Sequence, residues 1–268
     1  MHDRLGALRA KVREFSSALV GFSGGVDSAL LAVVTRQELG RERMVAAVGR
    51  SASVAADQWE AAQLLATTFD VPLVEIETHE LQDPRYVANP TNRCFFCKTE
   101  LWQRLGALAT ERQLAVVCDG TNADDLGEHR PGSAAGLAAG VRSPLAEVGL
   151  TKAEVRAAAR TLGIPNWNAP AAPCLSSRVQ YGLQITPQRL RQVEAGEALL
   201  RQLGVTGDLR VRHQGDAARI EVEPAWIGRI EARLADIAAR LQEIGFRSVE
   251  VDPRGYRRGS LLLDRRAP

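Results

Sequence analysis

Residues 23–28 read Ser-Gly-Gly-Val-Asp-Ser, and this glycine-rich stretch decides the fold because of what flanks it. The preceding residues, 17–22, form a short apolar run typical of a buried strand, and residues 28–39 carry apolar side chains at helical spacing. Two glycines let a ligand approach the backbone closely, and the N–H groups at a helix start favour an anion. The stretch therefore predicts an anion-binding loop between a strand and a helix.

This loop differs from two other nucleotide-binding loops. The chain contains no G-x-x-x-x-G-K-[ST] motif, and the turn lacks G-x-G-x-x-G. Ser23 and Ser28 instead add hydroxyl donors beside the glycines. The sequence therefore excludes a Walker A loop and a Rossmann fingerprint at this turn.

The N-terminal part of the chain repeats the order strand, loop, helix. Apolar patterning predicts strands at residues 17–22, 44–49, 73–76 and 114–119, and helices at residues 3–15, 28–39, 54–69 and 97–113. Strands that alternate with helices of this length predict an α/β fold, in which a parallel sheet has helices on both faces. Ligands of such sheets bind beyond the carboxyl ends of the strands.

The remainder of the chain predicts two long loops and a second, smaller domain. Residues 120–149 are rich in Gly, Asp, Ala and Pro, a capping-box helix follows from Thr151 to Gly163, and a proline-rich loop ends at Cys174. Beyond residue 186 the pattern predicts helices at residues 186–203 and 224–244 and strands at residues 209–211, 218–222 and 248–251. We expect a main domain of residues 1–183 and a smaller α+β C-terminal domain of residues 184–268.

Composition and charge limit the classes of protein. The 268 residues include 34 Lys plus Arg and 32 Asp plus Glu, and this balance gives no indication of non-specific binding to nucleic-acid backbone, although it is compatible with local basic patches. No run approaches the about 20 apolar residues of a membrane span, and the N-terminus matches no signal peptide or lipidation motif. We expect a cytoplasmic protein that contacts no membrane, in which disulfides are disfavoured.

Three of the four cysteines lie in distinctive motifs. Cys94 and Cys97 form a C-x-x-C between Arg93 and Lys98, at a helix start that favours thiolates, and Cys174 lies in the proline-rich loop. Three thiolates suit a [4Fe-4S] cluster with one open iron, whereas zinc would need a fourth ligand such as His129. A thioredoxin-type dithiol is a weaker interpretation, because Cys94 does not follow the strand that such a motif expects. The fourth cysteine, Cys118, lies in an apolar strand and is interpreted as a small buried hydrophobe.

Two motifs resemble those of the N-type ATP pyrophosphatases, the PP-loop enzymes with an adenine nucleotide alpha hydrolase-like fold. They are residues 23–28 and the stretch 119–125, Asp-Gly-Thr-Asn-Ala-Asp-Asp, at a strand end. The resemblance implies that ATP binds with its pyrophosphate in the first motif, its adenosine near residues 49–51 and Mg²⁺ on a carboxylate. The implied ATP-binding residues are Ser23, Gly24, Gly25, Asp27, Ser28, Ser51, Gly120, Thr121, Asn122 and Asp125.

Over nearly its whole length the chain resembles the LarE family of ATP-dependent sacrificial sulfur transferases of nickel-pincer nucleotide biosynthesis. The supporting stretches are residues 92–102, 120–132, 142–145 and 173–178. In that family ATP adenylylates a carboxylate of pyridinium-3,5-biscarboxylic acid mononucleotide, and a sulfur nucleophile then forms a thiocarboxylate. The resemblance therefore implies a nucleotide substrate of low molecular mass, and it also favours a homo-oligomer.

The cysteines indicate which subgroup the chain resembles. The simplest members consume the sulfur of a single cysteine that aligns with Cys174. A chain that also has Cys94 and Cys97 resembles the subgroup whose three cysteines hold a [4Fe-4S] cluster with a transferable sulfide. The resemblance then implies a separate sulfide donor and repeated turnover.

Candidate catalytic and substrate-binding residues follow from the same stretches. We assign catalytic roles to Cys174, Asp27 and Arg178. Arginine guanidinium groups bind carboxylate or phosphate through two parallel hydrogen bonds, and Arg210 and Arg212 would share one face of a strand. The candidate substrate-binding residues are Arg130, Arg142, Ser177, Arg210 and Arg212. A solvated sheet face is the alternative interpretation of Arg210 and Arg212.

Other functions are compatible with parts of the pattern. An iron-sulfur-dependent tRNA thiolase shares the loop and cysteines but needs an RNA-binding surface, which the charge balance does not indicate. An ammonia-using ligase like NAD synthetase would leave the cysteines without a role. A nucleotide sensor or iron-sulfur scaffold would bind ATP without releasing pyrophosphate.

Overall fold

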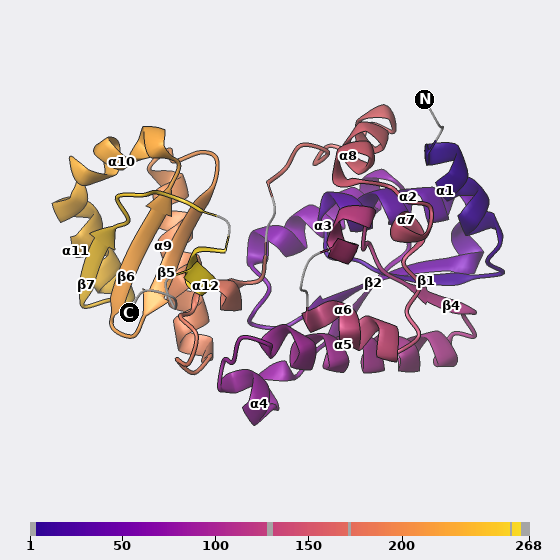
Figure 1. The fold of residues 1–268 in the computed structure, drawn as a ribbon, viewed down its shortest axis with the longest axis horizontal. Helices are drawn as coiled ribbons and strands as arrows, with labels where there is room; N and C mark the ends of the chain where they lie inside the picture. The colour runs from indigo at the N-terminus through magenta and orange to yellow at the C-terminus, as the bar shows by residue number, and fades with distance from the viewer. Residues whose placement is uncertain (1–3, 128–130, 171–172, 258, 264–268) are drawn as a thin grey trace. The chain divides into compact units, whose positions relative to one another are not determined.

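The chain forms two compact units in the computed structural model, which describes residues 4–127, 131–170, 173–257 and 259–263 (Figure 1). The first unit consists of Met1–Asp83 and Asn92–Ala172, and the second of Pro84–Thr91 and Pro173–Pro268. The division expected at residues 183/184 falls inside the second unit. The change of sequence pattern at residue 186 marks the start of a helix and does not mark a change in packing.

A short segment of the N-terminal sequence packs into the second unit. The Nδ2 atom of Asn89 donates to the carbonyl oxygens of Val179, Gln180 and Leu183, at 3.3, 2.8 and 3.0 Å. The hydroxyl of Tyr86 lies 2.6 Å from the Ser176 Oγ. These contacts explain why residues 84–91 belong with residues 173–183, which no local pattern indicates.

The first unit contains the parallel sheet that the sequence predicts. Its strands are β1 (Ala18–Gly21), β2 (Met44–Arg50), β3 (Leu73–Glu77) and β4 (Val116–Cys118), in the order β3-β2-β1-β4. All three pairings are parallel, with Ala18 opposite both Met44 and Val116. The carboxyl ends of the four strands therefore share one edge.

Helices cover both faces of this sheet, because successive side chains of a strand point to opposite faces (Figure 1). Ala18 and Val20 belong to the core formed with α1 (Arg4–Arg13), α2 (Val26–Leu39), α3 (Ala56–Thr68) and α8 (Lys152–Thr161). Leu19 instead packs in a cluster with Trp102 of α5 (Arg93–Glu111) and Ala135 of α6 (Pro131–Ala138). The predicted α/β fold class is confirmed.

Several element boundaries differ from the prediction. Helix α5 begins at Arg93 instead of residue 97, so the C-x-x-C lies within the first five residues of the helix. The predicted loop 120–149 contains η3 (Ala123–Gly127), α6 and α7 (Pro144–Glu147). The capping box of α8 is confirmed, with the Thr151 N–H donating to Glu154 at 2.9 Å. The short elements are η1 (Arg41–Arg43), η2 (Glu80–Gln82), α4 (Pro84–Val87) and η4 (Leu175–Arg178).

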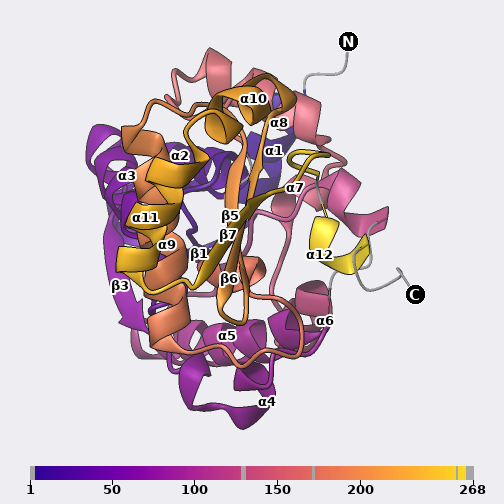
Figure 2. The ribbon, with the colours of Figure 1, turned by 90° about the vertical axis from the view of Figure 1, so that its left-hand side faces the viewer.

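The second unit is the smaller α+β unit that the sequence predicts. Its strands β5 (Leu209–Gln214) and β6 (Ala217–Val222) are antiparallel, and β7 (Ser248–Val251) runs parallel to β6. Figure 2 shows α9 (Pro187–Gln202) and α11 (Leu234–Ile244) beside this sheet. Val211 and Ile220 pack with both helices in one apolar core. Arg210, Arg212 and Glu221, at alternate positions, belong to the opposite face.

The helix predicted for residues 224–244 is two helices, α10 (Pro224–Glu231) and α11. The break at Ala232 and Arg233 contains neither glycine nor proline, so helix propensity gives no indication of it. The final short helix is α12 (Ser260–Leu263). Among the described residues no helix is both long and apolar enough to cross a membrane.

Candidate active site

Hydrogen bonds between its two serines shape the loop after β1. The Ser28 Oγ lies 3.1 Å from the Ser23 Oγ, donates to the Gly25 carbonyl at 3.0 Å and accepts the Ser23 N–H at 3.2 Å. Because Gly25 is the N-cap of α2, the loop ends where that helix presents its first N–H groups. The geometry agrees with the predicted anion-binding loop.

Two glycines at the site are required by close contacts. Gly24 has φ +74°, and a Cβ there would lie 3.3 Å from the Gln58 carbonyl oxygen. A Cβ on Gly120 would lie only 2.7 Å from the Ser28 backbone nitrogen. Gly120 therefore lets the residues after β4 approach the start of α2.

Asp27 contacts two side chains from distant parts of the sequence. The Asn122 Nδ2 donates to its Oδ1 at 3.1 Å, and the Lys152 Nζ donates to its Oδ2. Lys152 is the first residue of α8 and is one of only three lysines in the chain, with Lys11 and Lys98. Sequence reasoning assigned no function to Lys152. The small number of lysines in the sequence is the one signal that could have drawn attention to it.

The stretch 119–125 forms a hydrogen-bonded turn beside Asp27. The Thr121 Oγ1 donates to Asp119 at 2.8 Å, and the Ser143 Oγ donates to the same carboxylate at 2.7 Å. The Asp125 Oδ2 accepts the Asn122 N–H at 3.1 Å. Of the predicted nucleotide-binding residues here, Asn122 faces Asp27, while the Thr121 hydroxyl is bonded to Asp119.

A buried carboxylate supports the residues after β2. Glu80 is 2% exposed, and its Oε1 accepts hydrogen bonds from the Ser51 and Ser53 hydroxyls at 2.5 and 2.8 Å. Its Oε2 is buried and has no hydrogen-bond partner among the described residues. Sequence reasoning selected Ser51 but missed Glu80, because β2 and β3 bring the two together only in the folded sheet.

Arg142 contacts a carboxylate of its own loop. Its Nε and Nη2 donate to the two Glu147 carboxylate oxygens at 2.8 and 2.5 Å. This pairing raises the pKa of Arg142, and the pKa of Glu147 is lowered mainly by the same hydrogen bond. The guanidinium also lies 5.4 Å from the Phe15 ring centroid. The group predicted to meet substrate therefore pairs with Glu147 in this structure.

The cysteines have different environments. Near the start of α5, Cys94 is exposed and Cys97 is half-buried, and their spacing of three residues puts them on one side of the helix. Cys118 is 1% exposed, and burial raises the pKa of its thiol to about 12. Within the described ranges no group of three or more Cys, His, Asp or Glu side chains is arranged as a metal site.

In the second unit, Arg178 holds the segment that carries Cys174. Its Nη1 donates to the Cys174 carbonyl at 3.1 Å, to the Ser177 Oγ at 3.1 Å and to the Pro173 carbonyl. Its Nε and Nη2 bind Glu197 at 2.9 and 3.0 Å. Cys174 itself is half-buried and caps η4. Arg178 therefore orients the loop of the half-exposed cysteine.

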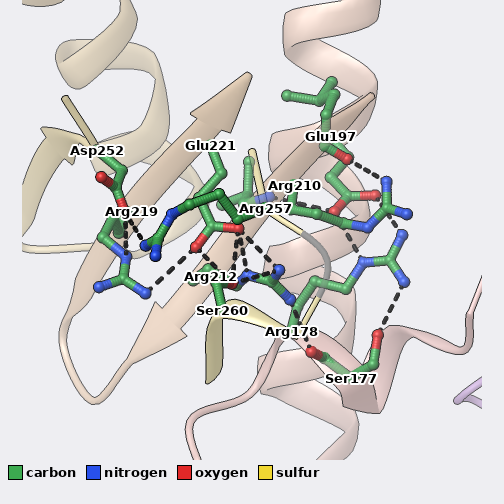
Figure 3. Close-up of polar contacts among 12 residues, drawn as sticks. Ser177, Arg178, Glu197, Arg210, Arg212, Arg219, Glu221, Asp252, Arg257 and Ser260 are labelled. Carbon is green, nitrogen blue, oxygen red and sulfur yellow. Dashed lines mark hydrogen bonds and ion pairs between the residues drawn. The ribbon is translucent and has the colours of Figure 1, made fainter. Parts of the chain in front are cut away.

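An arginine cluster occupies the polar face of the second sheet (Figure 3). Among the described residues, six guanidinium groups lie around three carboxylates. The arginines are Arg178, Arg210, Arg212, Arg219, Arg254 and Arg257, and the acids are Glu197, Glu221 and Asp252. Buried charge of one sign is costly unless it is compensated, so an anion bound at this face would be stabilised.

The two predicted arginines of β5 differ within this cluster. Arg212 donates to Glu221 at 2.8 Å, to the Ser177 carbonyl at 2.9 Å and to the Ser260 Oγ at 2.9 Å. Arg210 donates to the Leu209 carbonyl at 2.6 Å and lies 5.0 Å from the Tyr256 ring centroid. Burial lowers the pKa of Arg210, and repulsion from Arg178 lowers it further. An anion beside Arg210 would relieve both effects.

The predicted site residues thus lie in two groups. The first unit brings together the residues that follow β1 and β4, and separately supports Ser51 with Glu80. The second unit contains Cys174, Ser177, Arg178, Arg210 and Arg212. Arg130 and His129 lie outside the described residues.

The fold and the loop define a class. A serine- and glycine-bounded loop joins the carboxyl end of a central parallel strand to a helix N-terminus, and lacks both the Walker A lysine and the Rossmann glycine pattern. This is the PP-loop arrangement. The NAD synthase family model matches residues 2–88, which include the loop.

Relatives match along nearly the whole chain. The pyridinium-3,5-bisthiocarboxylic acid mononucleotide synthase of Lactiplantibacillus plantarum is 34% identical over 254 residues, which cover 95% of this chain and 92% of that protein. An uncharacterised protein of Synechocystis is 41% identical over 97% of both chains. An uncharacterised protein of Methanocaldococcus jannaschii is 27% identical over 89% of this chain and 90% of its own. The chain belongs to the LarE family of PP-loop sulfur transferases and is an ATP-using enzyme.

Proposed function

We propose that the enzyme uses ATP to adenylylate a carboxylate of pyridinium-3,5-biscarboxylic acid mononucleotide and then replaces the carboxylate oxygen by sulfur, giving a thiocarboxylate. The observation that carries this proposal is the loop of residues 23–28, whose Asp27 contacts Lys152, in a chain that also has Cys174. Its relative from Lactiplantibacillus plantarum is named for a bisthiocarboxylic acid product.

The first step activates a poor electrophile. A carboxylate oxygen of the substrate attacks the α-phosphorus of ATP, the bond to the bridging oxygen breaks, and pyrophosphate leaves. The N–H groups at the start of α2 and the Ser23 hydroxyl would bind the departing pyrophosphate, and the ammonium of Lys152 adds a positive charge beside Asp27. The product is an acyl adenylate, whose AMP is a good leaving group.

The PP-loop family uses Mg²⁺ with ATP, and this chain has suitable ligands. Asp27 and Asp125 both contact Asn122, at 3.1 Å in each case. Carboxylate oxygens are ligands that Mg²⁺ prefers, and the ion keeps several of its other positions for water and nucleotide phosphates. We assign Mg²⁺ to this pair of carboxylates and adenosine to the residues around Ser51.

The second step needs a sulfur nucleophile, and we assign it to the cysteines. Three thiolates are a donor set that suits a [4Fe-4S] cluster, and Cys94 and Cys97 lie on one side of a helix start, where the dipole favours thiolate. We propose that Cys174 completes the set. When bound, the cluster would supply a transferable sulfide. Arg178 and Glu197 would orient the Cys174 segment for that task.

The arginine cluster is proposed to bind the anionic groups of the substrate. Arg210 combines burial with repulsion from Arg178, so a substrate phosphate or carboxylate would be most strongly stabilised there. Arg212 and Ser177 would act by shaping this surface, since Arg212 binds the Ser177 carbonyl. Arg130 and Arg142 remain candidate contacts to substrate.

The reaction also has requirements outside this chain. A cluster sulfide that is transferred must be replaced, so we propose a cytoplasmic sulfide donor as a partner. Membership of the family is the basis for proposing a homo-oligomer. Neither requirement involves a membrane or a nucleic acid.

The adenylylation step can be tested by measuring pyrophosphate release from ATP with the purified enzyme. We expect release only when pyridinium-3,5-biscarboxylic acid mononucleotide is present, and we expect Asp27→Ala to abolish it while iron and sulfide content stay unchanged. Unchanged release in that variant would remove Asp27 from the mechanism. Release without a carboxylate substrate would contradict adenylylation of this compound.

A further inference from the structure

We infer that Asn166 is a positioning residue for pyrophosphate, because its amide fixes the orientation of the Gly24–Gly25 peptide so that the Gly25 N–H is directed at the anion. This inference rests on the proposed binding of ATP at residues 23–28. Asn166 lies beyond α8, about 140 residues from the loop in sequence, and no motif in the sequence connects the two.

The contact is short and its direction is defined. The Asn166 Nδ2 donates to the Gly24 carbonyl oxygen at 2.6 Å. Its Oδ1 is buried and accepts no hydrogen bond from any described residue. A flipped amide would set Oδ1 against the Gly24 carbonyl oxygen, so that carbonyl determines which way the amide of Asn166 faces.

Peptide geometry transmits this contact to the neighbouring N–H group. The Gly24 carbonyl and the Gly25 N–H belong to one planar trans peptide, in which they point in opposite directions. Holding the carbonyl on the side of Asn166 therefore directs the Gly25 N–H to the other side. The acceptor of that N–H is the Ser23 Oγ at the long distance of 3.4 Å, and Gly25 is the N-cap of the 14-residue helix α2.

Such an anchor is needed because two glycines adjoin the peptide. Glycine adopts many backbone conformations at little cost, and Gly24 already has φ +74°. Without a bond to the carbonyl, the peptide could rotate and turn the carbonyl oxygen toward the phosphate side, where it would repel an anion. Asn166 therefore acts through the backbone of Gly24 and does not touch pyrophosphate itself.

The test compares three proteins by isothermal titration with two probes, inorganic pyrophosphate in the presence of Mg²⁺ and adenosine. Asn166→Ala removes the anchor. Asn168→Ala is the matched control, since the exposed Asn168 side chain accepts from Arg156 at 2.9 Å in the same segment. We expect Asn166→Ala to bind pyrophosphate about tenfold more weakly, as for one lost hydrogen bond to a charged group, and to bind adenosine like wild type.

Comparing the loss of pyrophosphate affinity with the change in adenosine affinity separates a positioning role from a general structural effect. A loosened fold would weaken both ligands and lower the melting temperature below that of Asn168→Ala. If Asn166→Ala does not fold, Asn166→Leu keeps the side-chain volume without the donor and should give the same split.

Equal pyrophosphate affinity in wild type and Asn166→Ala would overturn the inference alone, because wild type would still bind the anion. A wild-type enzyme that does not bind pyrophosphate would overturn both the inference and the proposed ATP site. Failure to form a thiocarboxylate would contradict the proposed function without changing the pyrophosphate split.

Discussion

The Asp27 carboxylate of the PP-loop accepts hydrogen bonds from two side chains that are distant in sequence. Asn122 lies in the turn after β4 and Lys152 at the start of α8, and both donate to Asp27. These contacts therefore link the loop after β1, the turn after β4 and helix α8. The Lys152 side chain is half-exposed, and in the proposed function its ammonium contacts a phosphate of ATP. A PP-loop has no Walker lysine, and this arrangement supplies a cation from a distant helix instead.

Replacing Lys152 tests that role. We expect Lys152→Met to lower kcat/KM for ATP at least about tenfold, because a charge-assisted contact to phosphate is lost and the charge of Asp27 is left uncompensated. Steady-state pyrophosphate release measures this. Lys11→Met, which removes an exposed pair with Glu14, is the control and should retain wild-type kinetics. Equal kinetics for both variants would exclude Lys152 from ATP binding.

Gly120 is a residue at which the fold is sensitive to a single methyl group. A Cβ would lie 2.7 Å from the Ser28 nitrogen, so Gly120→Ala must displace backbone, at a cost of roughly 1–3 kcal/mol in the free energy of unfolding. Gly106, inside α5 at a position where an added Cβ would meet no atom within 4 Å outside its own helix backbone, is a matched control. Gly106→Ala should stabilise the helix by about 1 kcal/mol. Urea unfolding would disprove the packing argument if both variants were stabilised.

At the scale of elements, the sequence predicted the strands of the parallel sheet but missed side-chain contacts between the loops at the edge of that sheet. Strand and helix patterning predicted all four parallel strands, because each has apolar residues that pack in or against the core, and parallel strands bring their following loops to one edge. Of two residues that meet at that edge, Ser51 and Glu80, the sequence predicted only Ser51. A pairing between side chains 29 residues apart has no local signal.

The strand β5 also carries a buried histidine. His213 is 3% exposed, and burial lowers its pKa from 6.5 to about 4. Its Nε2 lies 3.0 Å from the Gln192 Oε1 of α9, and its Nδ1 is buried without a hydrogen-bond partner among the described residues. The fold therefore holds the neutral ring, and protonation opposes folding.

The pH dependence of stability follows from this shift. Between pH 6.5 and about 4 the unfolded chain binds the proton and the folded chain does not, so stability falls as pH falls through that window and is unaffected above it. The contribution reaches roughly 3 kcal/mol at its limit. His213→Gln should flatten this part of the melting-temperature profile. The same substitution at the exposed His79 is the control and should leave the profile unchanged. An unchanged slope in His213→Gln would show that His213 is not the group responsible for this pH dependence.

At the scale of the whole molecule, the chain is built from two units that interrupt each other in sequence. The boundary could not be predicted, because residues 84–91 join the second unit through Asn89 and Tyr86, far from the pattern change at residue 186. Sequence reasoning selected candidate site residues within contiguous motifs. It did not select Lys152, Glu80, Glu197 or Asn166, because their contacts with the candidate residues are tertiary.

The three cysteines are divided between these units, with Cys94 and Cys97 in the first and Cys174 in the second. A shared cluster therefore requires residues from both, and ligation would couple them. The proposed sulfur step would use cysteines of both units, whereas the proposed adenylylation step would use residues of the first unit.

The most direct measurement is the mass of the nucleotide product that the anaerobically purified enzyme forms from pyridinium-3,5-biscarboxylic acid mononucleotide, ATP and Mg²⁺, for wild type and Cys174→Ala. The account predicts that wild type forms a thiocarboxylate with one oxygen replaced by sulfur, while Cys174→Ala releases pyrophosphate and forms no sulfur-containing product. A product without sulfur from wild type, or an undiminished thiocarboxylate yield from Cys174→Ala, would contradict it.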